Sequence, residues 1–177
     1  RNLFLKRGQR PWEVPQPASA ALRAASARSG SQELERRERL ILLCLINHPA
    51  LVPEFLDEFS GMDLLTRELD SLRAQLINTA AHATSLDMAG FRGHLQERGF
   101  GPLLDRLTNQ AMRLNEWYLG PEAADDDART GLRQMFALHR KTVTLDRELK
   151  AAEAAFGADP SEANFNALAG LREQLLS

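Results

Sequence analysis

The chain has 177 residues and a net charge of −2; Leu and Ala together number 55, whereas Val and Ile number three each. Buried parallel strands are rich in Val and Ile and helices favour Leu and Ala, so this composition excludes a parallel α/β fold and indicates an all-α protein. The single cysteine excludes an internal disulfide and indicates a reduced, cytoplasmic compartment, and the longest apolar run, Leu40–Ile46, is too short to span a membrane.

The first 30 residues differ in charge from the rest of the chain. They carry six Lys or Arg, one acidic residue and three prolines (Pro11, Pro15 and Pro17), without a sustained apolar period. We therefore interpret residues 1–30 as a flexible basic linker, which could touch nucleic acid only weakly. Because the sequence starts at Arg1 and shows no signal peptide, we expect it to be an internal fragment of a longer protein.

A helical bundle is predicted over residues 31–121. Its first helix should span Gln32–Asn47, with a charged front half and a back half that is apolar on all sides, which is typical of a buried central helix. A second helix is predicted over Pro49–Ser60 and a third from an N-cap at Asp63 to about Ala81. Two further helical segments are expected between residues 85 and 119, the first of them capped by a serine.

The pattern changes over residues 122–177. One long helix is predicted from Glu122 to about Phe156, with a length of about 50 Å. The run Asp159–Glu162 then reads as an N-cap, a first-turn proline and a glutamate that begin a final helix. Two helices joined by so short a turn form an antiparallel hairpin, and its apolar stripes exceed what the hairpin alone can bury.

Catalytic and metal-ligating patterns are not recognised in the sequence. The histidines lie far apart, and no glycine-rich phosphate loop precedes a helix. Asp125–Asp127 are interpreted as a solvated helix start, Glu35 and Glu38 as part of an exposed charged face, and Cys44 as an inert core thiol. We therefore expect no catalytic residue, cofactor or metal in this chain.

Two parts of the sequence carry a family resemblance. The run Arg37–Pro49 (RERLILLCLINHP) resembles the opening of the C-terminal helicase-binding domain of bacterial DnaG-type primases, where an R-E…L-L…L-I-x-H-P helix is followed by a second helix at the proline. The stretch Leu145–Phe165 resembles the long helix and terminal hairpin of the alphaproteobacterial branch. The resemblance covers residues 35–177, although residues 82–120 are compatible in pattern only.

This resemblance implies a bundle and a C-terminal hairpin that binds the N-terminal domain of the hexameric, DnaB-type replicative helicase during DNA replication. It also implies that the parent protein is a primase, a DNA-directed RNA polymerase, whose zinc-binding and magnesium-binding modules lie upstream of this fragment. The implied location is the bacterial cytoplasm at the replication fork. The N-terminal domain of the replicative helicase shares this fold and is an alternative, although a terminal hairpin favours the primase.

The hairpin is predicted to hold the partner-binding residues. They are the apolar Phe156, Phe165, Leu168, Leu171 and Leu175, and the charged Arg172, which could set specificity. The apolar members could instead form the core of the hairpin itself. A helical nucleic-acid-binding or regulatory module is a further alternative, but the net charge of −7 over residues 31–177 disfavours phosphate binding.

Overall fold

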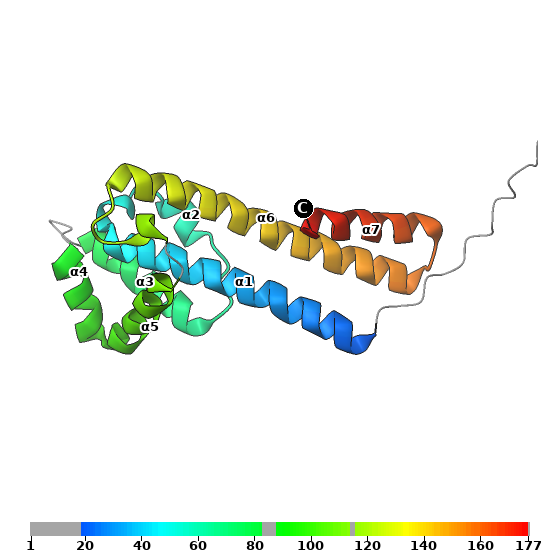
Figure 1. The fold of residues 1–177 in the computed structure, drawn as a ribbon, viewed down its shortest axis with the longest axis horizontal. Coiled ribbons are helices and arrows are strands. Elements are labelled where there is room, and N and C mark those ends of the chain that lie inside the picture. Colours follow the sequence, from blue (N-terminus) through cyan, green and yellow to red (C-terminus); the bar gives the residue numbers. More distant parts are fainter. Residues whose placement is uncertain (1–18, 83–87, 114–115, 177) are drawn as a thin grey trace, which may run out of the picture. The chain divides into compact units, whose positions relative to one another are not determined.

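The computed structural model describes residues 19–82, 88–113 and 116–176, and every regular element in these ranges is helical (Figure 1). The predicted all-α class, with a bundle and a long helix, is confirmed. By its internal contacts the chain divides into two compact units, one made of residues 24–142 and one to which residues 143–177 belong. None of the described helices is long and apolar enough to cross a membrane.

The elements follow one another with short connections. In chain order they are α1 (Ala20–Asn47), the 3₁₀ turn η1 (Pro49–Leu51), α2 (Leu56–Ser60), α3 (Arg67–His82), α4 (Met88–Leu95), the π turn η2 (Gln96–Phe100), α5 (Gly101–Met112), the 3₁₀ turn η3 (Trp117–Leu119), α6 (Asp125–Ala158) and α7 (Glu162–Leu176). Helix α6 contributes its first half to the unit of residues 24–142 and its second half to the other unit.

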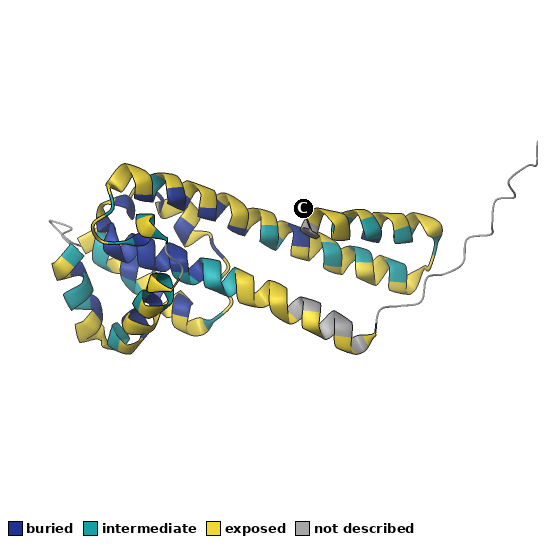
Figure 2. Ribbon diagram, viewed as in Figure 1, coloured by how far each residue is buried: buried dark blue, intermediate teal, exposed yellow. Residues whose placement is uncertain are grey.

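The second half of α1 forms the centre of the larger unit. The side chains of Ile41–Ile46 are at most 2% exposed, as the sequence predicted for a helix that is apolar on all sides (Figure 2). The buried side chains of the surrounding helices belong to the same core; they are Phe59 of α2, Leu69, Leu72 and Leu76 of α3, Phe91 and Leu95 of α4, Leu103, Leu104 and Leu107 of α5, and Ala128, Leu132, Met135 and Phe136 of α6.

Helix α1 begins twelve residues earlier than predicted, at Ala20 instead of Gln32. The expectation of a flexible linker is therefore wrong for residues 20–30, and residues 1–18 of the predicted linker lie outside the described part of the chain. The segment is rich in alanine, the residue with the highest helix propensity, and it contains no proline. Propensity alone thus extends the helix beyond the part that packs in the core.

The predicted second helix, Pro49–Ser60, is interrupted. The structure has η1, then a turn, and α2 begins only at Leu56. Pro53 lies between them, where it has no N–H to donate and its ring disfavours a continuous helix. Leu56 is 40% exposed, whereas Phe59 is buried.

Helix α3 also starts later than predicted. Its N-cap is Thr66, whose Oγ1 accepts a hydrogen bond from the Leu69 N–H at 3.4 Å, and not Asp63. Leu65, which the predicted helix included, consequently lies before the helix and is 49% exposed. The serine predicted to cap the next helix, Ser85, lies outside the described residues.

The long helix is confirmed, with bounds at Asp125–Ala158 in place of Glu122–Phe156. The division into units differs from the predicted boundary between residues 121 and 122. Residues 125–142 belong to the bundle because Leu132 and Phe136, four positions apart on one helix face, are buried in its core. Only the part from residue 143 onward belongs to the second unit.

Candidate functional site

The C-terminal hairpin consists of the second half of α6 and of α7, which run antiparallel. The rings of Phe156 and Phe165 have their centroids 6.1 Å apart near the turn. Farther from the turn, Arg172 Nη2 lies 3.1 Å from Glu153 Oε1, and both side chains are about half exposed. An aromatic contact and an exposed ion pair therefore connect the two helices.

Side-chain and backbone hydrogen bonds close the hairpin turn. The Asp159 N–H donates to the Ala155 carbonyl at 2.9 Å, and Asn164 Nδ2 donates to the Asp159 carbonyl at 2.9 Å. Ser161 caps α7, because its Oγ accepts a 3.4 Å bond from the Asn164 N–H; the predicted cap at Asp159 is wrong. Sequence reasoning missed Asn164, although its position three residues after a cap serine was a usable signal.

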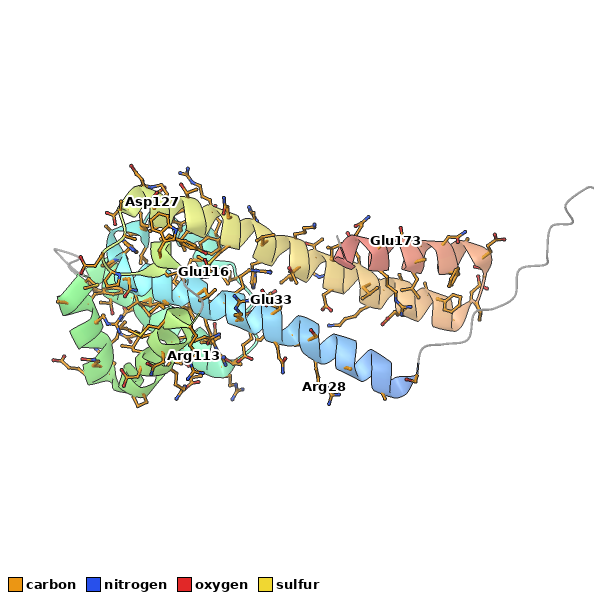
Figure 3. All side chains as sticks on the ribbon, in the orientation of Figure 1. Arg28, Glu33, Arg113, Glu116, Asp127 and Glu173 are labelled. Carbon is orange, nitrogen blue, oxygen red and sulfur yellow. The ribbon has the colours of Figure 1, made fainter. Side chains whose placement is uncertain are left out.

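The predicted partner-binding residues have different environments. Leu168 is 5% exposed, whereas Phe156, Phe165 and Leu171 are half-buried. Arg172 is exposed, and the side chain of Leu175 lies outside the described residues. The described apolar members are thus largely covered. The exposed positions of α7 within the described side chains are small or polar; among them are Asn166, Ala167, Gly170, Arg172 and Glu173, the last of which is marked in Figure 3.

Large exposed apolar side chains of the described residues lie outside the hairpin. They are Leu56, Leu65, Met112, Trp117 and Leu138. These residues come from α2, the loop before α3, the end of α5, η3 and the first half of α6. Single exposed apolar residues are common on protein surfaces and do not by themselves define a binding site.

Glu38 is fully buried, so its predicted place on an exposed charged face is wrong. Its carboxylate accepts bonds from the Leu65 N–H at 3.1 and 3.3 Å and lies 3.4 Å from Nε2 of the buried His139. Glu38 lies between two arginines, one turn before the buried Ile41, so the local pattern does not reveal its burial. A buried carboxylate needs such partners because an unpaired one is costly.

A second buried polar cluster lies where α1 ends. Asn47 Nδ2 donates to the Leu119 carbonyl at 2.6 Å. The ring of His48 lies between Asp125 Oδ1, 2.9 Å from Nδ1, and the Gly120 carbonyl, 3.1 Å from Nε2. These two side chains therefore hold the segment that leads into α6 against the end of α1.

Cys44 is a buried core thiol, as predicted. Its side chain is fully buried, and burial, helped by the negative charge of Asp125, raises the pKa of its thiol to about 12. The acidic run Asp125–Asp127 lies in the exposed first turn of α6, where Figure 3 marks Asp127. Within the described residues, no group of three or more His, Cys, Asp or Glu side chains could hold a metal ion.

A shallow cleft of about 260 Å³ lies between α2 and the first half of α6; it is lined by Glu54, Phe55, Glu58, Arg133, Phe136 and Arg140. Two stacked phenylalanine rings, with centroids 5.5 Å apart, contribute to it. Both oxygens of Glu54 are engaged by arginines, Arg129 at 2.8 Å and Arg133 at 3.1 Å. The lining balances two acidic and two basic side chains.

No family model, no curated protein and no solved structure matches this chain. Its function is therefore inferred from its residues and their geometry. The covered apolar stripe and the polar outer face of α7 are the features of the hairpin on which such an inference depends.

Proposed function

We propose that this chain is the helicase-binding domain of a bacterial DnaG-type primase, a non-catalytic module that recruits the primer-synthesising enzyme to the replicative helicase. The observation that carries the proposal is the C-terminal pair of helices, which belongs to a compact unit distinct from the bundle. It occurs in a chain whose run Arg37–Pro49 resembles the opening of that family's helicase-binding domain. The catalytic modules, with their zinc and magnesium, would belong to the parent polymerase, upstream of this chain.

Residues of the run Arg37–Pro49 pack in the core of the bundle or bond to neighbouring elements. This supports the interpretation that the resemblance reflects a shared fold. The apolar residues of the run fill the centre of the bundle, and the side chains of Glu38 and His48 are buried with polar partners. Arg37 Nη1 donates to Thr142 Oγ1 at 2.8 Å and so connects α1 to α6. A sequence pattern with this many packing constraints is informative about architecture, whereas partner choice depends on surfaces elsewhere.

The outer face of α7 is the surface that we propose contacts the helicase. Because Leu168 is buried and the neighbouring apolar side chains are half-buried, the exposed side chains of α7 are small or polar over residues 162–174, where side chains are described. Glu173 places a negative charge on this face, and Arg172, which also pairs with Glu153 of α6, lies half exposed at its edge. Small side chains such as Ala167 permit close approach of a partner helix. Charges at such a rim act mainly on specificity and association rate.

Calorimetry of the full chain with the N-terminal domain of a bacterial DnaB-type helicase tests the proposal. Arg172→Glu should weaken binding about tenfold, because it reverses a charge on the proposed contact face. Arg106→Glu is a matched control, since Arg106 of α5 is also exposed and also pairs across helices, with Glu68 of α3. It should leave the affinity unchanged, and circular dichroism should show the same helicity in both variants.

The alternatives predict different results. Absence of binding by the unmodified chain contradicts the proposed function, and equal weakening by both substitutions contradicts the role of the hairpin. Assembly of the chain into hexamers, measured by light scattering, would favour the N-terminal domain of a helicase. DNA binding with a steep salt dependence would favour a nucleic-acid-binding module.

A further inference from the structure

His48 occupies a buried position where α1 ends and the segment leading into α6 passes. Its side chain is 3% exposed, and both ring nitrogens face oxygen atoms. Nε2 lies 3.1 Å from the Gly120 carbonyl, and Nδ1 lies 2.9 Å from the carboxylate of Asp125. A carbonyl and an ionised carboxylate offer only hydrogen-bond acceptors, so both contacts are satisfied only when both ring nitrogens carry a proton.

We propose that His48 is a proton-dependent clasp. As an imidazolium it holds the carbonyl of Gly120 and the first residue of α6, Asp125, against the end of α1. When it loses one proton, a nitrogen lone pair faces an oxygen lone pair, and one of the two contacts is lost. Because one of the two contacts requires the second ring proton, the clasp is expected to open as the pH rises. This inference does not depend on helicase binding.

Other charged groups lie near His48, but they are exposed or paired with other residues. Asp125 is therefore the charged group in direct contact with the His48 ring. Asp126 pairs with Arg129 one turn along α6, and Asp127 lies exposed in the same turn. Cys44, one turn before His48 on α1, is a neutral thiol near neutral pH because its pKa is raised to about 12.

Two further ionisable groups lie on the neighbouring elements. Arg92 of α4 donates to Asn47 Oδ1 at 2.8 Å and to Thr108 Oγ1 at 3.1 Å. Glu116, next to η3, is engaged by Tyr118. Among the described residues, the hydrogen bonds of the His48 ring are to Asp125 and Gly120 and not to either of these two groups.

Opening of the clasp should affect only the start of α6, because a neighbouring hydrogen bond between the end of α1 and the same segment does not depend on pH. Asn47 keeps its 2.6 Å bond to the Leu119 carbonyl whatever the pH. The amides that report on the start of α6 are those of Asp127 and Ala128, which both donate to the Ala124 carbonyl, at 3.0 and 3.1 Å. They should become less protected from hydrogen exchange when the clasp opens, while the core of the bundle stays closed.

The test uses the full chain, with nitrogen NMR of the histidine rings and amide hydrogen exchange at pH 6 and pH 8.5. At pH 6 both nitrogens of His48 should be protonated, and the protection factors of Asp127 and Ala128 should fall about tenfold by pH 8.5. In Asp125→Asn, a neutral His48 can accept a bond from the new amide, so the pH dependence should disappear. His82→Gln is the control, because His82 is exposed and bonds only within its own helix, to the Asn78 carbonyl at 2.7 Å.

Three results would overturn the inference. One is a single neutral tautomer of His48 at pH 6. A second is an equal fall in protection in the unmodified chain and in Asp125→Asn. A change of the pH dependence in His82→Gln would likewise assign the effect to general histidine titration and contradict the clasp.

Discussion

Gly131 of α6 lies against the ring of Tyr118, and this contact permits a sharp test of the bundle. A Cβ atom built on Gly131 would approach two carbons of the tyrosine ring more closely than 3.0 Å, a distance that real Cβ atoms essentially never show. Glycine inside a helix costs about 1 kcal/mol relative to alanine. We infer that position 131 requires glycine, because the ring of Tyr118 occupies the space that a side chain at this position would need.

Gly131→Ala should therefore destabilise the chain although it improves helix propensity. Displacing a packed ring typically costs about 1–3 kcal/mol, and the propensity gain of about 1 kcal/mol offsets part of it. We expect a net loss of about 1 kcal/mol in the free energy of unfolding. Gly93→Ala in α4 should instead stabilise by about 0.5–1 kcal/mol, because no atom lies within 4 Å of its Cβ position.

The position of the ring can be followed directly, because Tyr118 is the only tyrosine of the chain. Burial, followed by the charge and hydrogen bond of Glu116, raises the pKa of Tyr118 to about 12 from 10.0. Displacement into solvent should return this pKa toward 10.0 in Gly131→Ala, as measured by the phenolate absorbance during an alkaline titration. Urea unfolding of the same samples gives the stability change.

The sign of the pH dependence follows from the raised pKa. The folded chain holds the phenolic proton more tightly than the unfolded chain, so this contribution to stability is complete below pH 10 and is lost as the pH rises toward 12. Gly131→Ala should show a smaller alkaline loss. If Gly131→Ala stabilises as much as Gly93→Ala and leaves the tyrosine titration unchanged, the proposed contact is refuted.

Three further predictions concern buried groups and the hairpin turn. Cys44 should not react with a thiol reagent at pH 8 unless the chain unfolds, because it is fully buried and its pKa is raised to about 12. Glu38→Ala should cost about 3 kcal/mol or more in urea unfolding, since it leaves buried partners unpaired, whereas exposed Glu33→Ala should cost less than about 0.5 kcal/mol. Asn164→Ala should lower the melting temperature through loss of its bond to the turn, while Asn166→Ala, on the exposed face, should not.

The parts of the fold that the sequence predicted depend on local pattern. The run Leu40–Ile46 is apolar on every side, so its burial follows without knowledge of its neighbours. The long α6 helix follows from a stretch without proline, and the turn after Gly157 follows from Pro160. Pro53 predicts the interruption of the second helix by the same rule, but the apolar residues on both sides of it suggest one continuous helix.

The parts that the sequence did not predict depend on partners far away in the chain. Glu38 has a charged neighbour on each side and reads as a surface residue, but it meets His139, which lies 101 positions later. No period in the sequence can show that a loop N–H, that of Leu65, will fall within 3.1 Å of the same carboxylate. Burial of a charge is thus a tertiary property, since it requires that several partners converge.

The hairpin shows a second limit of sequence patterns, which concerns apolar residues. An apolar stripe on each helix indicates that something covers it, but periodicity cannot distinguish the second helix of the hairpin from another protein. In the structure the Phe156 and Phe165 rings meet and Leu168 is buried, so much of the stripe is already covered. The proposed partner would then contact the exposed side of α7, at whose edge Arg172 lies. Binding through such a face should weaken with rising salt concentration, because exposed charges are screened, whereas binding through the apolar stripe should not.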